Sequence, residues 1–294
     1  MKKIKSIFLF VLLAISCITD ETNPTQVVQN PSVYGTGEYE LIHEGRVREY
    51  YYYEPLLLEE NAPLIVVLHG YEGNKEQLMQ WMDFRGLADQ NRFTLVYPQG
   101  LKDGGGKNHW NANLQISTIN DIGFLTELTE QLVETYDLNQ DNVFVCGFSN
   151  GGFMAYELAI KAPETFNAFA SITGTMSLGT WEDRTLSVPK SILQISGALD
   201  RVVPITGMTN LYGGWGGAPG MNQIMSFWAE QLNYTDYNKE DTDLISINQY
   251  SNANNDLYLW YYLFKDMGHE LPREEQHGIN GTDLVWEFFE LNMK

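Results

Sequence analysis

The chain of 294 residues is poor in cysteine and in positive charge. Its 2 cysteines lie at positions 17 and 146, and because the first falls at the end of an expected leader, no disulfide is predicted within the remaining chain. Lys and Arg number 18 against 38 Asp and Glu, which gives a formal net charge of −20. A surface this acidic repels phosphate backbones and anionic headgroups, which argues against nucleic acid or a peripheral membrane surface as a partner.

Motifs for metals and phosphates are also lacking. No cysteine or histidine cluster has the spacing of metal ligands, and no glycine-rich phosphate loop follows the first strand-like run. We therefore expect chemistry that needs neither a metal ion nor a cofactor. Cys146 falls in a predicted core strand, where a thiol is expected to serve packing rather than chemistry.

The N-terminal segment is predicted to direct export. An apolar run at residues 7–15 follows three lysines and is too short to span a membrane, which is typical of a signal peptide. It leads into Ala-Ile-Ser-Cys17, which resembles a bacterial lipobox with its leucine one position early. We expect a signal peptide at residues 1–17 with Cys17 lipidated, and ordinary cleavage is the alternative. The polar residues 18–37 would then tether a domain at residues 38–294 to a bacterial envelope membrane, periplasmic or on the cell surface.

The stretch from Asn142 to Tyr156 carries the strongest chemical signal. An apolar run typical of a buried parallel strand stops at Gly147, displays Ser149 and continues as a helix-like pattern. A serine nucleophile needs such a sharp strand-to-helix turn, where the hydroxyl is exposed and the helix N-terminus faces developing negative charge. Gly147 and Gly151 flank the serine because side chains there would collide across the turn. The pattern predicts a nucleophile elbow.

An acid and a base are expected to follow Ser149 in chain order, each at the exit of a later strand. Asp200 and His269 both follow apolar, strand-like runs in this way. We therefore predict that His269 takes the proton of Ser149 and that Asp200 orients the imidazole. His277 is the alternative base, although it lies beyond a charged stretch.

Two backbone N–H groups are predicted to form an oxyanion hole. One belongs to Asn150, directly after the serine, and the other to Tyr71, which follows a central strand-like run ending in Leu-His-Gly. His69 in that run is expected to orient the loop through hydrogen bonds. Two tryptophans are candidates for substrate contact: Trp110, and Trp215 in the glycine-rich loop at residues 212–217, where an indole can stack on a sugar or an aromatic acyl group.

The periodicity of the sequence predicts a single α/β domain with a mostly parallel sheet covered by helices on both faces and an antiparallel pair of strands at its start. Composition agrees, because 44% hydrophobic and 13% aromatic residues can fill both faces. Strand-like runs lie at about 39–53, 64–69, 93–98, 142–147, 167–173, 190–196 and 257–264. Helix-like runs lie at about 75–89, 121–137, 150–162, 221–232 and 282–292.

Seven motifs occur in order along the chain: His69-Gly-Tyr-Glu-Gly-Asn74, Tyr97-Pro-Gln-Gly100, Trp110-Asn111, Asn120-Asp-Ile-Gly-Phe124, Gly147-Phe-Ser-Asn-Gly-Gly152, Gly197-Ala-Leu-Asp-Arg-Val-Val-Pro204 and Gly268-His-Glu-Leu-Pro272. Together they resemble the secreted polyhydroxybutyrate depolymerase and feruloyl and acetylxylan esterase group of the α/β-hydrolases, which includes the first carbohydrate esterase family. The resemblance spans about residues 38–292. It implies an α/β-hydrolase fold with Ser149 as nucleophile, Asp200 as acid and His269 as base.

The chain departs from that group at Asn120, where members often have aspartate, and in having no disulfide. The resemblance implies a serine esterase acting through an acyl-enzyme, on feruloyl or acetyl esters of plant polysaccharide. Three alternatives stay open: depolymerisation of hydroxyalkanoate polyesters or their oligomers, a surface glycan-binding lipoprotein without catalysis, and a peptidase on the same fold. The expected partner is an ester substrate, with a membrane contacted only through the lipid anchor. The sequence leaves the oligomeric state open.

Overall fold

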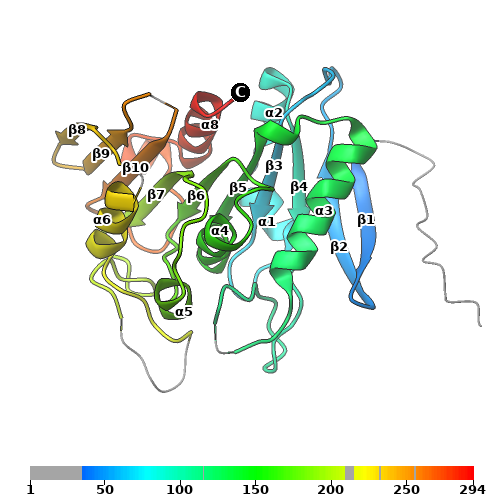
Figure 1. The fold of residues 1–294 in the computed structure, drawn as a ribbon, viewed down its shortest axis with the longest axis horizontal. Helices are drawn as coiled ribbons and strands as arrows, with labels where there is room; N and C mark the ends of the chain where they lie inside the picture. Colours follow the sequence, from blue (N-terminus) through cyan, green and yellow to red (C-terminus); the bar gives the residue numbers. More distant parts are fainter. Residues whose placement is uncertain (1–34, 115, 209–214, 232, 255) are drawn as a thin grey trace, which may run out of the picture. The chain divides into compact units, whose positions relative to one another are not determined.

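The structure is a computed structural model and describes residues 35–294 apart from 115, 209–214, 232 and 255 (Figure 1). The described part of the chain forms one compact unit, Gly35–Lys294. The expected leader, the expected lipidation site at Cys17 and most of the expected tether lie outside the described residues.

One sheet runs through this unit, and its strands follow the order β1-β2-β4-β3-β5-β6-β7-β10-β9-β8 (Figure 1). The central strands are parallel: β4 (Thr94–Pro98), β3 (Leu64–Leu68), β5 (Val143–Phe148), β6 (Ala168–Ile172), β7 (Ser191–Gly197) and β10 (Tyr258–Phe264). The edges are antiparallel: β1 (Gly37–His43) with β2 (Arg46–Tyr53), and β9 (Ile245–Ser251) with β8 (Asp236–Asp241). The mostly parallel sheet confirms the predicted α/β class.

Helices cover both faces of the sheet, because alternate residues of its buried strands feed two separate cores. Leu64, Val66 and Leu68 of β3 point into one core, and Ile65 and Val67 point into the other. The first core is closed by α3 (Asp121–Tyr136), α4 (Asn150–Lys161) and α6 (Met221–Gln231). The second is closed by α1 (Lys75–Trp81), α2 (Arg85–Asn91) and α8 (Gly281–Leu291).

Several elements differ from the expectation. The helix-like run at 75–89 forms two helices, α1 and α2. The strand-like run at 39–53 forms the expected antiparallel pair, β1 and β2, which turns at Glu44 and Gly45, both with positive φ. The hairpin of β8 and β9 was not expected, because every residue of β8 is exposed and its sequence carries no apolar alternation. The sequence periodicity also did not predict three short elements: α5 (Leu178–Glu182), α7 (Glu274–His277) and the 3₁₀ turn Gln140–Asn142.

Candidate active site

Ser149 stands at a sharp turn between β5 and α4. Its backbone has φ 52° and ψ −116°, a conformation that costs a non-glycine residue about 1–3 kcal/mol. Two hydrogen bonds hold the turn: Ser149 N donates to Ile172 O at 2.8 Å, and Phe153 N donates to Ser149 O at 3.0 Å. The sequence argument for the flanking glycines agrees with the structure, since a Cβ at Gly147 would sit 2.2 Å from the Gly151 carbonyl and one at Gly151 would sit 2.3 Å from the Leu68 oxygen.

A chain of hydrogen bonds joins Ser149, His269 and Asp200. His269 Nε2 lies 2.9 Å from Ser149 Oγ, and His269 Nδ1 lies 2.7 Å from Asp200 Oδ2. An ionised carboxylate can only accept, so Nδ1 carries the proton and Nε2 is left as the acceptor for the serine hydroxyl. The other carboxylate oxygen, Asp200 Oδ1, accepts from the N–H groups of Val202 at 2.8 Å and Val203 at 2.9 Å. This arrangement fixes the imidazole in the tautomer that can remove a proton from the serine.

Adjacent parallel strands bring Asp200 and His269 together. Gly197 at the end of β7 pairs in register with Phe264 at the end of β10, so the two exit loops leave the sheet side by side. Gly197 is required there, because a Cβ would lie 2.3 Å from the oxygens of Met267 and Gly268. The Asp200 side chain is 1% exposed and the His269 side chain 18% exposed, which leaves the ring accessible from the serine side.

A mainly apolar cavity of about 310 Å³ opens beside Ser149. Its lining comes from several loops and the start of α4: Tyr71, Leu114, Ile116, Ser149, Asn150, Phe153, Val202, Val203 and Trp215. The Trp215 indole meets the Phe153 ring edge-on at 4.9 Å, so it is supported by the helix behind it. The remainder of its glycine-rich loop up to residue 214 lies outside the described residues.

Both residues expected to form the oxyanion hole border this cavity. Asn150 is the first residue of α4, where backbone N–H groups have no partner within the helix. Tyr71 follows β3 and lies in the same lining as Ser149. The structure therefore brings together the serine, the histidine, the aspartate and the two loops that the sequence singled out.

Trp110 is placed differently from the expected substrate contact. The residue is 0% exposed and lies outside the cavity lining. Its indole Nε1 donates to His69 O at 2.9 Å, its backbone N donates to Asn150 Oδ1 at 2.7 Å, and Asn150 Nδ2 donates to Trp110 O at 3.0 Å. Buried in this way, Trp110 braces the loop that carries Tyr71 against the residue that follows Ser149, and it cannot touch a substrate in the cavity.

His69 has a structural position, as expected. Its Nδ1 donates to Gly70 O at 2.7 Å, and its Nε2 accepts from Gly100 N at 2.9 Å. Burial lowers the pKa of His69 to about 4, because the charged ring would lose its hydration. A neutral ring is needed for this pairing, since a protonated Nε2 has no lone pair to offer Gly100.

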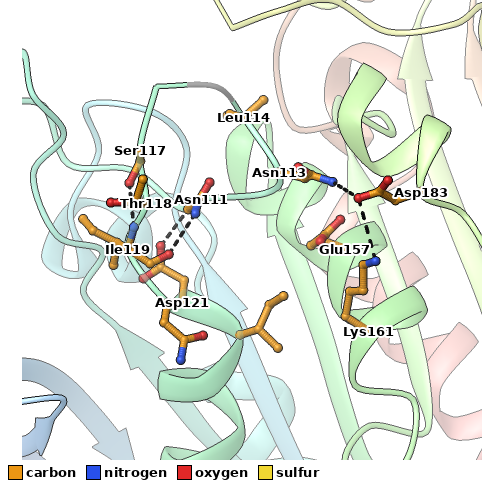
Figure 2. A pocket seen from close by; sticks show the side chains of 12 residues that line it. Asn111, Asn113, Leu114, Ser117, Thr118, Ile119, Asp121, Glu157, Lys161 and Asp183 are labelled. Atoms are coloured by element: carbon orange, nitrogen blue, oxygen red, sulfur yellow. Dashed lines mark hydrogen bonds and ion pairs between the residues drawn. The ribbon is translucent and has the colours of Figure 1, made fainter.

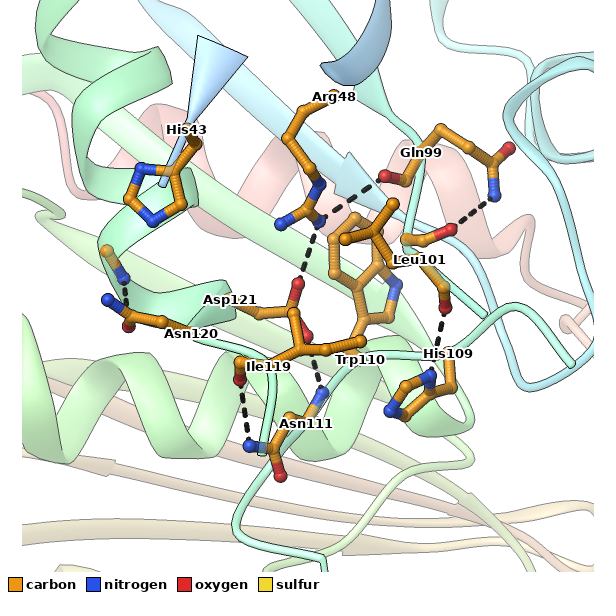
Figure 3. Close-up of polar contacts among 12 residues, drawn as sticks. His43, Arg48, Gln99, Leu101, His109, Trp110, Asn111, Ile119, Asn120 and Asp121 are labelled. Atoms are coloured by element: carbon orange, nitrogen blue, oxygen red, sulfur yellow. Dashed lines mark hydrogen bonds and ion pairs between the residues drawn. The ribbon is translucent and has the colours of Figure 1, made fainter. Parts of the chain in front are cut away.

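A buried ion pair supports the segment that carries Trp110 and Asn111, and sequence reasoning missed it (Figure 3). Arg48 donates to Asp121 Oδ1 at 2.7 Å, and Asp121 Oδ2 accepts from Asn111 N at 2.8 Å. The guanidinium also lies 3.6 Å above the ring centroid of Phe124. The sequence did contain a signal for this pair, because Arg48 alternates along β2 with Tyr50 and Tyr52, which are buried on the same face.

The other candidates lie away from the serine or serve packing. His277, the alternative base, accepts from Arg273 N at 3.0 Å and packs against Phe264, so the structure places His269 rather than His277 beside Ser149. Cys146 is buried in the second core, and burial raises the pKa of its thiol.

Within the described residues, no group of three or more His, Cys, Asp or Glu side chains is arranged to hold a metal ion. Among the helices of the described part, none is long and apolar enough to cross a membrane.

Known proteins resemble this chain in sequence and in fold. The family described as Esterase PHB depolymerase matches residues 49–186. Over these residues the chain is similar to this esterase group, and its fold is that of the α/β-hydrolases. Putative esterase NocK of Nocardia uniformis subsp. tsuyamanensis is 29% identical over 58% of this chain and 50% of its own length. Probable feruloyl esterase C of Aspergillus niger is 29% identical over 70% of this chain and 74% of its own.

The solved structures agree on the fold. The acetyl xylan esterase from Aspergillus awamori matches with a TM-score of 0.60 at 16% identity, over 87% of this chain and 99% of its own. At that identity the likeness supports the α/β-hydrolase fold alone. The match to NocK spans half of that relative, so the names of the relatives do not by themselves assign an activity to this chain.

Proposed function

We propose that the protein is a carboxylic ester hydrolase that works through an acyl-enzyme on Ser149. The observation that carries this proposal is the hydrogen-bonded chain Ser149–His269–Asp200 at the edge of a cavity of about 310 Å³. The similarity of residues 49–186 to the esterase group supports the same chemistry. A peptidase on this fold would use the same side chains, but the matched family is described by ester hydrolysis.

In the first half of the reaction, Ser149 Oγ attacks the ester carbonyl while His269 Nε2 takes the hydroxyl proton. Asp200 keeps the imidazole in position and stabilises the positive charge that forms on it. The proton then passes to the alkoxy oxygen of the leaving alcohol, and the acyl group stays on the serine. In the second half a water molecule takes the place of the alcohol, and the acid is released with Ser149 restored.

The negative charge on the carbonyl oxygen is stabilised by the N–H groups of Tyr71 and Asn150. The donor from Asn150 stands at the N-terminus of α4, where the helix dipole adds positive potential. Strain in the Ser149 backbone favours catalysis because it keeps the hydroxyl at the top of the turn, clear of its own helix.

The proposed substrates are feruloyl or acetyl esters of plant polysaccharide. Apolar side chains dominate the cavity, and the supported Trp215 indole offers an edge or face to an aromatic acyl group. An acetyl group would leave much of about 310 Å³ unfilled, so the lining favours the phenolic acyl group of the two. Relatives named feruloyl esterase and acetylxylan esterase support this class.

A second candidate is hydrolysis of hydroxyalkanoate polyesters, because the matched family is described as a PHB depolymerase. A panel of methyl ferulate, acetylated xylan and a hydroxybutyrate dimer separates these options. We expect the highest kcat/KM on methyl ferulate. A clear preference for the hydroxybutyrate dimer would replace the proposed substrate class with the polyester, and turnover of none of the three would contradict the hydrolase itself.

The N-terminal expectations complete the proposal. We propose residues 1–17 as a signal peptide with Cys17 as lipidation site, and residues 18–37 as the tether of the catalytic domain at residues 38–294. An enzyme exported in this way meets polysaccharides that are too large to import. Its proposed place is the bacterial envelope, periplasmic or on the cell surface.

A further inference from the structure

A second cavity, of about 520 Å³, lies next to the one beside Ser149 and has a different chemical character (Figure 2). Leu114 lines both cavities, so they are neighbours. The rest of the second lining is mostly amide, hydroxyl and charged: Asn111, Asn113, Ser117, Thr118, Ile119, Asn120, Asp121, Ile122, Glu157, Lys161 and Asp183. The mechanism proposed above uses none of these polar side chains to react with the ester.

The lining offers donors and acceptors from two sides. On one side Asn113 Nδ2 donates to Asp183 Oδ2 at 3.1 Å, and Lys161 Nζ lies 4.0 Å from the same oxygen, so the three heads converge (Figure 2). On the other side Asn111 Oδ1 is shielded from solvent and has no hydrogen-bond partner among the described residues. Because this oxygen is closed to solvent, a ligand in the cavity would meet instead the converging heads of Asn113, Lys161 and Asp183.

Charge limits the kind of ligand. Asp183 is the one exposed carboxylate of this lining and lies 4.0 Å from Lys161, so no surplus of positive charge is left to hold an anion. Asp121 is already engaged by Arg48 and by Asn111 N, and Glu157 accepts from Thr180 Oγ1 at 2.5 Å. The cavity therefore presents amides, one ammonium and one exposed carboxylate. These groups suit a neutral ligand with many hydroxyl groups, because each hydroxyl can both donate and accept a hydrogen bond.

Position relates the cavity to the ester. Ser149 immediately precedes α4, and Glu157 lies eight residues further along it, about 12 Å away at the rise of an α-helix. A short oligosaccharide can cover that distance. We propose that the polar cavity is a saccharide subsite, which holds neutral glycan on the alcohol side of the ester while the acyl group occupies the apolar cavity. This inference rests on the proposed ester hydrolase activity.

The kinetic test compares two esters with the same acyl group, methyl ferulate and a feruloylated xylo-oligosaccharide. The variants are Lys161→Met and Asp183→Ala, and Glu182→Gln is the matched control, an exposed acidic neighbour outside the lining. We expect each variant to lower the ratio of kcat/KM for the oligosaccharide ester to that for methyl ferulate at least about fivefold, through KM, on the scale of one lost hydrogen bond. The control should keep the wild-type ratio. An unchanged ratio in both variants would overturn the subsite.

A binding measurement separates the subsite from catalysis. Unesterified xylotetraose is titrated into wild-type protein and into Lys161→Met, and binding is followed by calorimetry. Saturable binding that the variant weakens supports the subsite, even if neither ester is hydrolysed, in which case the hydrolase proposal fails alone. Hydrolysis of both esters without saturable binding of xylotetraose and with an unchanged ratio overturns the subsite and leaves the hydrolase standing.

Discussion

Two buried tryptophans give a matched test of how the oxyanion loop is held. Trp110 and Trp228 are both 0% exposed. The indole of Trp110 donates to His69 O at 2.9 Å, whereas the indole nitrogen of Trp228 is buried without a hydrogen-bond partner among the described residues. Replacing each by phenylalanine removes a similar volume from the first core, but only Trp110→Phe removes a hydrogen bond.

The expected loss of stability depends on the polar group that each substitution leaves without a partner. Trp110→Phe leaves a backbone carbonyl in the interior without its indole donor, which costs about 1–3 kcal/mol, while Trp228→Phe deletes a donor that already had no partner. We therefore expect Trp110→Phe to lower the free energy of unfolding by about 1–3 kcal/mol more than Trp228→Phe does. Urea unfolding of both variants and of the wild type measures this difference.

Kinetics extend the comparison to the site. The His69 carbonyl lies two residues before Tyr71, so its release shifts a proposed oxyanion donor without deleting it. Removal of such a donor costs about 10²–10³ in kcat, and for a displacement we expect roughly a tenfold loss with little change in KM. Trp228→Phe should retain wild-type kcat on an aryl ester. Equal stability and equal kcat in the two variants would refute the bracing role of Trp110.

Three further outcomes are expected. Because burial lowers the pKa of His69 to about 4, the unfolded chain binds a proton between about pH 6.5 and 4 that the folded protein does not. The free energy of unfolding should fall as pH drops through that window, by up to about 3 kcal/mol, and urea unfolding of His69→Gln should show a flatter profile; an unaltered slope would contradict this. Trp215→Ala should raise KM for methyl ferulate and so lower kcat/KM by an amount equivalent to about 1–2 kcal/mol, whereas kcat/KM for an acetyl ester should hardly change. Equal effects on both esters would argue against an aromatic platform at Trp215. Cys17→Ser should release the protein from the membrane fraction of a bacterial host or leave it unprocessed, and equal solubility of both forms would favour ordinary secretion.

The parallel sheet and the meeting of Ser149, Asp200 and His269 could be read from the sequence for one physical reason. Buried parallel strands are continuous apolar runs, and their carboxyl ends share one edge of the sheet, so residues just after three such runs are brought together. Gly147 added a local signal, because the close approach of Gly151 leaves no room for a side chain.

Other features depend on contacts between distant segments. The hairpin of β8 and β9 pairs at the sheet edge through its backbone, and an exposed strand has no apolar period to detect. Trp110 resembled a substrate platform because tryptophan suits that role, and only the tertiary contacts with His69 and Asn150 reveal a brace. The pairing of Arg48 with Asp121 likewise joins residues 73 positions apart.

The central claim is that Ser149 forms an acyl-enzyme with His269 as its base. The most direct measurement is kcat on an aryl ester for Ser149→Ala and His269→Ala, with His277→Ala as the matched control. We predict that the first two variants lose at least about 10³ in kcat while keeping the wild-type unfolding transition, and that the control keeps its activity. Turnover that survives in Ser149→Ala, or that disappears in His277→Ala and not in His269→Ala, would contradict the account.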